Sequence, residues 1–340
     1  MKRWVRWTCA LLVLPPLLSI PVGYWMASGS LHPPRRPLTA QMITQTEVVF
    51  HEAHATREDL NVTAADGTIL RGWLVRPQSH LSDDKDSLDY VLVFHGIADN
   101  RMGVFDKAEF LVRAGYGVVL MDSRAHGESG GAIATLGWKE RDDVRAIISA
   151  LKSRENVRCI FALGVSMGAA IALQAAGEDA RIDGVIAEAP FSSLREASYD
   201  YAAFHLDPWL ARIYLRPGVE AGLWKIERES GFKVDAISPE HAVAARAFPV
   251  FLIGDEDDST LPARHVIAIY KHAKGPKRIW IVAHANHASG MGVARDEYER
   301  RCLDFLRAIQ CGRPMQHETP AHWTGLHSVN CLLAGFPLVA

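Results

Sequence analysis

The sequence predicts an α/β fold in which a mostly parallel central sheet is covered by helices on both faces. From residue 90 onward, short apolar runs alternate with longer stretches of helical periodicity. The short runs are apolar on both faces, which is typical of strands buried in the middle of a parallel sheet. Strands and helices that alternate in this way form a sheet with helices packed on both of its sides.

The expected elements follow from local signals. Residues 61–64 and 68–75 flank Asp66-Gly67, a pair that favours a two-residue turn, so an N-terminal antiparallel hairpin is expected. The expected parallel strands are residues 90–94, 117–121, 159–163, 185–187, 250–253 and 279–282, and the expected helices are residues 139–152, 167–176, 262–272 and 295–309. In such a sheet the ligand site lies at the carboxyl ends of the strands.

The chain of 340 residues suits one large domain with short additions at both ends. We expect a signal peptide or transmembrane signal anchor (1–30), a linker (31–45), the α/β domain (46–310) and an irregular tail (311–340). Residues 192–240 contain no convincing strand and are rich in aromatic residues. We interpret them as a small helical cap inserted over the site; the alternative is an ordinary helical excursion whose aromatic side chains pack inward.

The N-terminus has the pattern of an export signal. Lys2, Arg3 and Arg6 precede an uncharged run over residues 7–34, whose apolar part is close to the roughly 20 residues that span a bilayer. The small residues 27–29 resemble a cleavage site, so a cleaved signal and an uncleaved anchor both remain open. Because the positive charges stay in the cytoplasm, we expect the domain outside it, membrane-anchored or, after cleavage, periplasmic or secreted.

The composition argues against several kinds of partner. A formal net charge of −2 gives no reason to expect a nucleic-acid partner. The 5 cysteines are widely spaced and contain no CxxC pair, so no structural zinc site is expected. The chemistry derived below requires neither a metal nor an organic cofactor, and none is expected.

A serine in a GxSxG motif is the expected nucleophile. The motif occurs at residues 127–131 and again at residues 164–168. A nucleophile elbow needs a strand that runs into the motif and a helix that leaves it. Ser166 meets this requirement, because an apolar run precedes it and an alanine-rich helical run follows. Ser129 lies in a polar, glycine-rich loop, so we interpret it as a loop residue.

Two backbone N–H groups are the expected oxyanion donors. In hydrolases with such an elbow, one donor belongs to the residue after the nucleophile and the other to an early loop after a strand. These positions correspond to Met167 and Ile97. Gly96 lets the early loop approach the substrate closely, and we interpret His95 as structural.

The chain order to expect is serine, then acid, then histidine. The base should lie in the loop after the last strand, where His284 and His287 occur, and His287 is preferred because it lies deeper in that loop. The acid should follow the preceding strand, which runs into Gly254 and then four acidic residues. Asp257 is preferred as the acid that orients the imidazole, with Asp258 as the alternative.

With these residues in place, the chain resembles the α/β-hydrolase superfamily over roughly residues 61–309. Within it, the chain resembles membrane-anchored serine hydrolases of the dienelactone-hydrolase and prolyl-oligopeptidase-like branch. The motifs that carry the resemblance are Asp66-Gly67 with Gly72-Trp73, His95-Gly96, residues 122–129, residues 164–168, Gly254 with Asp257, and His287.

The resemblance implies the α/β-hydrolase fold and also bears on the acid. Relatives place the acid three residues after the strand-end glycine, which supports Asp257. A proline commonly follows the acid at a fixed spacing, and here Pro262 comes one place late. This spacing indicates that the acid loop is longer by one residue, so Asp258 remains the alternative for the acid. Within residues 122–129, Ala125 and His126 replace the glycine and its neighbour that are usual in relatives.

The expected function is that of a serine hydrolase. It would cleave a carboxylic ester or a related acyl compound through an acyl-enzyme on Ser166, with esters expected ahead of peptides. The alternatives are an acyltransferase or a serine peptidase with the same triad, or a non-catalytic binding protein that keeps the fold. The expected partners are a small-molecule acyl substrate and, through the N-terminal segment, the membrane.

Overall fold

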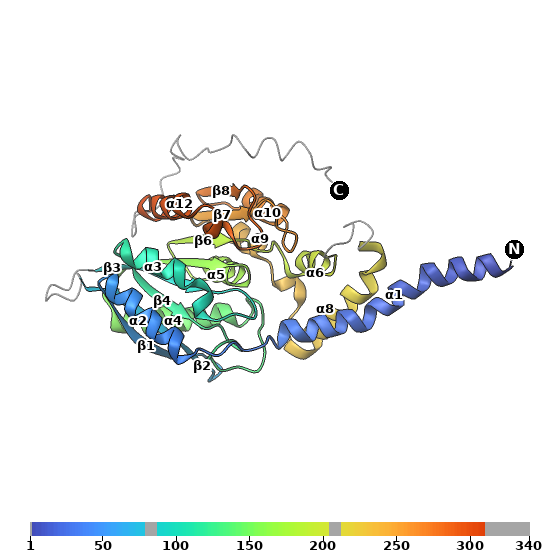
Figure 1. The fold of residues 1–340 in the computed structure, drawn as a ribbon, viewed down its shortest axis with the longest axis horizontal. Coiled ribbons are helices and arrows are strands. Elements are labelled where there is room, and N and C mark those ends of the chain that lie inside the picture. The colour runs from blue at the N-terminus through green and yellow to red at the C-terminus, as the bar shows by residue number, and fades with distance from the viewer. Residues whose placement is uncertain (1, 79–86, 204–211, 310–340) are drawn as a thin grey trace.

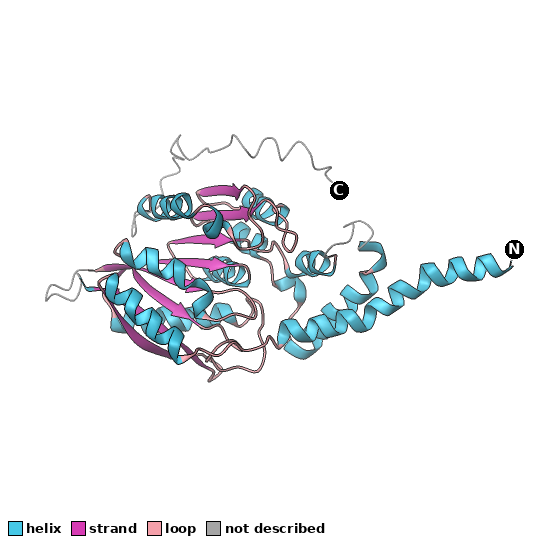
Figure 2. Cartoon of the chain, in the orientation of Figure 1, coloured by secondary structure: helices cyan, strands magenta, loops and turns pink. Residues whose placement is uncertain are grey.

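The computed structural model describes residues 2–78, 87–203 and 212–309, with residues 2–15 described by their backbone alone. Eight strands form one sheet in the order β1-β2-β4-β3-β5-β6-β7-β8. Helices cover both faces of the sheet, and a long N-terminal helix projects from one end of the molecule (Figure 1, Figure 2). The predicted tail, residues 311–340, lies outside the described residues.

The first two strands form the predicted hairpin. β1 (Ala55–Thr63) and β2 (Ile69–Pro77) are antiparallel, and Thr63 pairs with Ile69. The turn between them contains Gly67 at a φ of 81°, a conformation that glycine adopts without steric cost. β2 also pairs antiparallel with β4, and the remaining pairs in the sheet are parallel.

The other six strands contain the apolar runs from which they were predicted. They are β3 (Leu88–Phe94), β4 (Gly117–Met121), β5 (Val157–Val165), β6 (Gly184–Glu188), β7 (Val250–Asp255) and β8 (Lys277–Val282). Their side chains alternate between two hydrophobic clusters, one on each face of the sheet. In β3, Leu92 and Phe94 belong to one cluster, whereas Val91 and Val93 belong to the other. Burial on both faces explains why these strands are apolar throughout.

The helices divide between the two clusters. One cluster receives side chains from α4 (Glu140–Arg154), α5 (Met167–Glu178), α9 (Pro239–Ala245) and α10 (Arg264–His272). The other receives them from α2 (Ala40–Glu52), α3 (Phe105–Arg113), α11 (Gly290–Val293) and α12 (Arg295–Arg307). The predicted fold class, a mostly parallel sheet with helices on both faces and an antiparallel hairpin, is confirmed.

Four of these helices, α2, α3, α9 and α11, were not predicted from the sequence, and the two longer ones are α2 and α3. α2 begins inside the region expected to be a linker, because Thr39 caps it by accepting a hydrogen bond from the Met42 N–H at 3.2 Å, and Phe50 anchors its other end in the core. α3 follows a short 3-10 turn, η2 (Arg101–Val104), and buries Leu111 on the sheet.

The interval expected to be a cap is helical. It contains α6 (Leu194–Ala202), α8 (Arg216–Ser230) and the 3-10 turn η3 (Val234–Ala236), with residues 204–211 outside the described part of the chain. α6 lies beyond the ends toward which the parallel strands point (Figure 1, Figure 2).

The aromatic side chains of this interval point both inward and outward, so neither of the two expectations describes them completely. Phe232 is buried and stacks on Trp138, with ring centroids 5.9 Å apart. Tyr201 and Trp224 are exposed.

The N-terminal helix α1 (Lys2–Leu31) packs along α8 through small residues. A Cβ on Gly23 would lie 1.9 Å from the Gly218 carbonyl oxygen, and a Cβ on Gly218 would lie 2.3 Å from the Ser19 carbonyl oxygen. Ala27, one turn beyond Gly23, is buried in the same stripe. Small residues let the two helix backbones approach closely.

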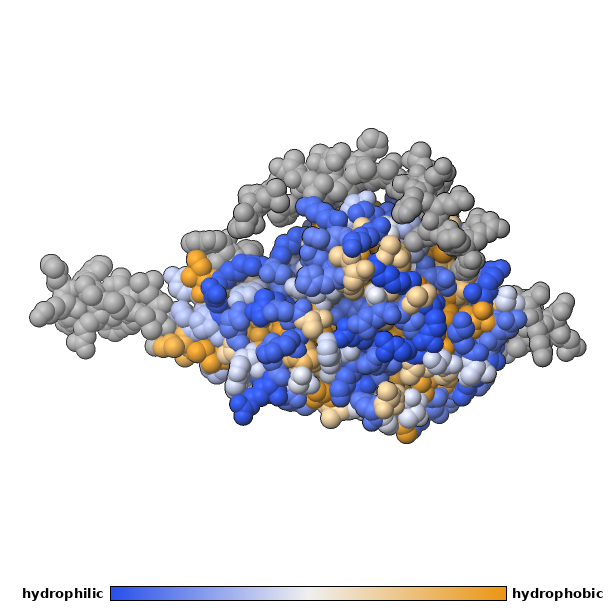
Figure 3. Space-filling model, turned by 180° about the vertical axis from the view of Figure 1, so that it is seen from behind, coloured by the Kyte–Doolittle hydropathy of each residue, from blue (hydrophilic) through white to orange (hydrophobic). Residues whose placement is uncertain are grey.

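The opposite face of α1 is apolar and exposed. Leu17, Leu18, Val22 and Trp25 are between 54% and 76% exposed. Figure 3 shows hydrophobic surface at the end of the molecule from which this helix projects. Within the described ranges, no helix has both the length and the apolar character that crossing a membrane requires.

The α1–α8 contact leads to a first prediction. We expect Gly23→Ala to destabilise this contact by about 1–3 kcal/mol, because the added Cβ overlaps backbone atoms of α8. The measurements are thermal unfolding and the rate of limited proteolysis within α1. Gly29→Ala is the matched control on the same helix, since a Cβ there meets nothing within 4 Å. Both variants gain similar helix propensity, so equal proteolysis rates would contradict the prediction.

Candidate active site

Ser166 lies in a tight turn between β5 and α5. Its φ of 53° and ψ of −113° are strained for a residue with a side chain. The flanking glycines have no room for a Cβ: one on Gly164 would lie 2.2 Å from the Gly168 carbonyl oxygen, and one on Gly168 would lie 2.3 Å from the Phe94 carbonyl oxygen. The GxSxG pattern is therefore a requirement of the backbone, and the turn leaves the Ser166 hydroxyl accessible.

Ser166, His287 and Asp258 form a continuous hydrogen-bonded chain. His287, in the loop after β8, places Nε2 at 2.9 Å from Ser166 Oγ and Nδ1 at 2.6 Å from Asp258 Oδ2. Ser166 and His287 are half-buried, whereas Asp258 is buried. This is the arrangement in which an imidazole removes a proton from a serine while a carboxylate fixes its tautomer.

The sequence favours Asp257 as the acid, but the structure places Asp258 against His287. Asp257 is exposed, and its N–H donates a hydrogen bond to the Ala285 carbonyl at 2.9 Å. Asp258 turns inward instead, and its second oxygen accepts the N–H groups of Thr260 and Leu261, each at 2.8 Å. The loop is longer by one residue than the family spacing, as the late position of the following proline had indicated.

The expected oxyanion donors lie beside the nucleophile. A Cβ on Gly96 would lie 3.7 Å from Ser166 Cβ, so the early loop approaches the elbow closely. The N–H groups of Ile97 and Met167 form no hydrogen bond with the described residues. Both amides are therefore unused by the fold in this part of the chain.

His95 fixes the orientation of one of these amides. The ring is fully buried; its Nδ1 lies 2.7 Å from the Gly96 carbonyl oxygen, and its Nε2 accepts the Ser123 N–H at 3.0 Å. Burial lowers the pKa of His95, which favours the neutral ring with Nδ1 as the donor. Because the peptide between Gly96 and Ile97 is trans, holding its carbonyl on the His95 side directs the Ile97 N–H the opposite way.

The other serine and histidine weighed from the sequence lie outside this arrangement. Ser129 is buried, and its Oγ donates to the Asp122 carbonyl at 2.6 Å and accepts the Arg71 N–H at 2.8 Å. His284 is exposed, and its N–H donates to Glu256 at 3.1 Å.

Two acidic residues behind the site were missed by the sequence reasoning. The main-chain carbonyl of Glu188 accepts the Ser166 N–H at 2.8 Å, and Asp255 Oδ2 accepts the N–H of Ala288, next to His287, at 2.7 Å. Burial and the nearby charge of Glu188 raise the pKa of Asp255 to about 7. The available signal was a charged residue at the end of an apolar strand run, which occurs in both β6 and β7.

A second Ser–His–Asp set lies in the interior. His265 places Nδ1 at 2.9 Å from Ser192 Oγ and Nε2 at 2.7 Å from Asp200 Oδ2. All three side chains are buried. These side chains connect α6 of the cap to α10. Because Ser192 is buried, a substrate could not reach its hydroxyl.

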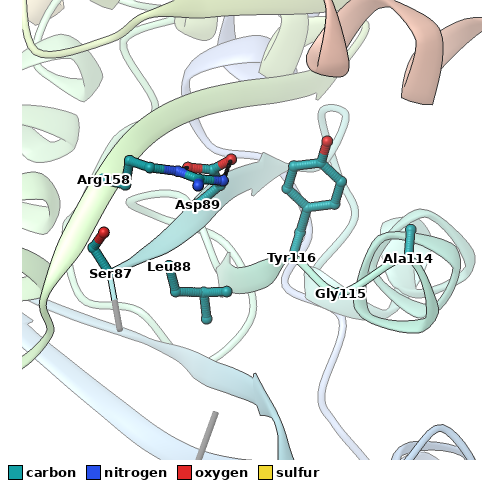
Figure 4. A pocket seen from close by; sticks show the side chains of 7 residues that line it. All are labelled: Ser87, Leu88, Asp89, Ala114, Gly115, Tyr116 and Arg158. Carbon is teal, nitrogen blue, oxygen red and sulfur yellow. Dashed lines mark hydrogen bonds and ion pairs between the residues drawn. The ribbon is translucent and has the colours of Figure 1, made fainter. Parts of the chain in front are cut away.

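A hollow of about 420 Å³ lies at the opposite end of the sheet, where β3 and β5 begin (Figure 4). Leu88, Tyr116, Asp89 and Arg158 are among the residues that line it, and the last two form an ion pair at 2.6 Å. Ser166 follows the carboxyl end of β5, whereas the hollow lies where β5 begins. The hollow is therefore not part of the candidate site.

The position of Asp258 gives a second prediction. We expect Asp258→Asn to lower the kcat of any Ser166-dependent reaction by about 10³–10⁴-fold, because the imidazole loses the carboxylate that orients it. Asp257→Asn, which changes the exposed neighbour in the same way, should leave kcat within about twofold of wild type. Steady-state kinetics of the two variants decide the assignment, and a large loss in the Asp257 variant would refute it.

The chain also resembles known proteins. Residues 86–243 match the profile of a family described as "Serine aminopeptidase, S33". The chain is 27% identical over 266 residues to YqkD, an uncharacterized protein of Bacillus subtilis, covering 75% of this chain and 83% of that protein. It is 26% identical over 256 residues to YfhR, an uncharacterized protein of Escherichia coli, covering 73% of this chain and 80% of that protein.

Among solved structures, an esterase of Pyrococcus furiosus is similar with a TM-score of 0.64 and 25% identity, covering 82% of this chain and 98% of that chain. The sheet order, the antiparallel first strands and the helices on both faces agree with this likeness. The chain has the α/β-hydrolase fold.

Proposed function

We propose that the protein is a serine hydrolase that cleaves carboxylic esters through an acyl-enzyme on Ser166. The observation that carries the proposal is the chain of hydrogen bonds from Ser166 through His287 to Asp258, built on a strained turn that exposes the serine. The likeness to the Pyrococcus furiosus esterase supports ester substrates.

The first half of the reaction acylates the serine. His287 Nε2 takes the proton of Ser166 Oγ while Oγ bonds to the ester carbonyl carbon. The negative charge that develops on the carbonyl oxygen is held by the N–H groups of Met167 and Ile97. The tetrahedral intermediate then breaks its bond to the alcohol oxygen, and His287 gives its proton to the departing alcohol.

The second half frees the serine. Water loses a proton to His287 and attacks the acyl carbon, and the second tetrahedral intermediate breaks its bond to Ser166 Oγ as the proton returns there. The carboxylic acid leaves. Asp258 stabilises the imidazolium that forms in both halves.

A test of this proposal uses a fluorophosphonate probe and p-nitrophenyl esters. We expect wild type to be labelled and to hydrolyse short-chain esters, whereas Ser166→Ala should not be labelled and should lose at least about 10⁴-fold in kcat. Ser129→Ala changes the other GxSxG serine and should keep the probe reactivity of wild type. Equal labelling of wild type and the Ser166 variant would refute the proposal.

The same assay separates esterase from peptidase activity. Aminoacyl p-nitroanilides offer the same nitrophenyl chromophore on an amide, and the name of the matching family makes them the appropriate competitor. We expect kcat/KM to favour the esters. A preference for the anilides would replace the esterase proposal with a peptidase that uses the same residues.

We also propose that the N-terminal helix is retained after export and holds the domain outside the cytoplasm, at the membrane. Ala27, the first of the small residues that resemble a cleavage site, is buried against α8. Beyond it, Leu31 is buried, and its carbonyl accepts the Ala134 N–H at 2.8 Å. Cleavage at residues 27–29 would remove the part of α1 that packs on Gly218.

This proposal predicts the mature N-terminus. In a chain expressed in Escherichia coli with a C-terminal tag, we expect intact-mass measurement to find residues 1–31 present and the protein to sediment with the membrane fraction. We expect residues 1–31 to be retained because cleavage would remove the part of α1 that packs on α8. A mature protein that starts at residues 28–30, or one that is absent from the membrane fraction, would contradict it.

A further inference from the structure

A pair of buried carboxyl groups lies directly behind the two loops that carry Ser166 and His287. Asp255 ends β7 and Glu188 ends β6, and they are 1% and 0% exposed. One oxygen of each, Asp255 Oδ1 and Glu188 Oε1, has no hydrogen-bond partner among the described residues. Two buried carboxylates with unpaired oxygens would be costly, so their protonation has to be considered.

The two unpaired oxygens border the same small space. A Cβ on Gly290 would lie 3.1 Å from Asp255 Oδ1 and 3.2 Å from Glu188 Oε1. A side chain at this glycine would therefore contact both oxygens. A single proton on Asp255, donated to Glu188 directly or through one water molecule, satisfies both oxygens at once.

The charges around Glu188 are balanced. Its Oε2 accepts the Tyr298 hydroxyl at 2.9 Å and lies 3.5 Å from Lys107 Nζ. Lys107 is also 3.7 Å from the half-exposed Asp106, and the thiol of Cys302 is buried nearby. The lysine charge therefore matches one carboxylate, that of Glu188, and does not match a second.

Asp255 faces further negative charge from the active-site side. Asp258 and His287 are its ionisable neighbours there, and the first of them is the carboxylate that binds the imidazole. Its own Oδ2 accepts the N–H of Ala288, which has a φ of 57° that alanine rarely adopts. The hydrogen bond that Ala288 donates to Asp255 thus holds a strained residue directly beside the proposed base.

We propose that Asp255 is a positioning residue that is protonated, shares its proton with Glu188, and thereby holds the loop of His287 in register with Ser166. The side chain of Glu188 fixes one end of this pair, while its main-chain carbonyl holds the Ser166 N–H. When Asp255 loses its proton, two adjacent buried carboxylates repel, and the Ala288 hydrogen bond is the contact that can move.

The sign of the pH dependence follows from the raised pKa of Asp255, which lies near 7 compared with its usual 3.8. A carboxyl group with a raised pKa binds its proton more tightly in the folded chain than in the unfolded chain. Its contribution to stability is fully present below the unfolded pKa and is lost as the pH rises through about 7. Asparagine at this position keeps a carbonyl for Ala288 and an N–H donor for Glu188 at every pH.

The test is Asp255→Asn in the full chain. We expect kcat of wild type for a p-nitrophenyl ester to fall by about tenfold or more between pH 7 and pH 8.5, and kcat of Asp255→Asn to stay level over that range. KM should differ little between the two. The Tm of Asp255→Asn should exceed that of wild type at pH 8.5 by about 3 °C or more, and this excess should be smaller at pH 5.5.

Two further variants separate positioning from general damage. Asp255→Ala removes the acceptor for Ala288 and should lower kcat at every pH, whereas Asp257→Asn, an exposed acid in the same loop, should keep the wild-type pH profile. The inference is overturned if Asp255→Asn shares the wild-type dependence of both kcat and Tm on pH, or if it loses as much kcat as Asp255→Ala. The activity readout depends on the proposed function; the Tm readout does not, so a Tm difference in a chain without esterase activity would support the proton pair alone.

Discussion

The backbone turn at Ser166 places the strictest demand on this chain, and the neighbouring parts of the site are arranged around it. The positive φ of Ser166 is held because α5 packs closely on the turn, where Gly164 has no room for a side chain, and on the end of β3, where Gly168 has none. The Ser166 N–H is secured by the carbonyl of Glu188, at the end of the neighbouring strand. Strain in the turn is thus balanced by contacts with the sheet and with α5, and the hydroxyl is presented at a fixed position.

Parallel strand order explains why distant residues meet at this turn. β5, β6, β7 and β8 are consecutive neighbours in the sheet, and they all end on the same edge. Glu188 ends β6, Asp255 ends β7 with Asp258 in the turn after it, and His287 follows β8. Each strand therefore delivers at least one polar group to the same place without any long loop having to cross the sheet.

The sequence predicted the sheet and the turn at Ser166 between a strand and a helix well, because both have strong local signals. Runs of buried apolar residues mark the strands, and small residues around a serine mark the elbow. The acid could not be fixed in the same way, since which of several consecutive carboxylates turns inward depends on the exact path of a turn, and Asp257 and Asp258 differ by one position along it. The packing of α1 on α8 could not be predicted from local signals either, because it brings together Ser19 and Gly218, which are 199 positions apart.

The acidic loop after β7 shows how environment, rather than residue type, assigns roles. Glu256 and Asp257 remain in water. Asp258 is buried but accepts hydrogen bonds from two N–H groups and from His287, which suits an acceptor-only carboxylate. Asp255 is buried beside another carboxyl group, and its pKa is raised for that reason.

The interior set of Ser192, His265 and Asp200 makes the same point for the serine and the histidine. Its hydrogen bonds are as short as those at the elbow, yet its serine is buried. Hydrogen-bond geometry alone therefore does not identify a nucleophile. Ser166 is distinguished by an accessible hydroxyl, which follows from the strained turn, and by unused backbone N–H groups beside it.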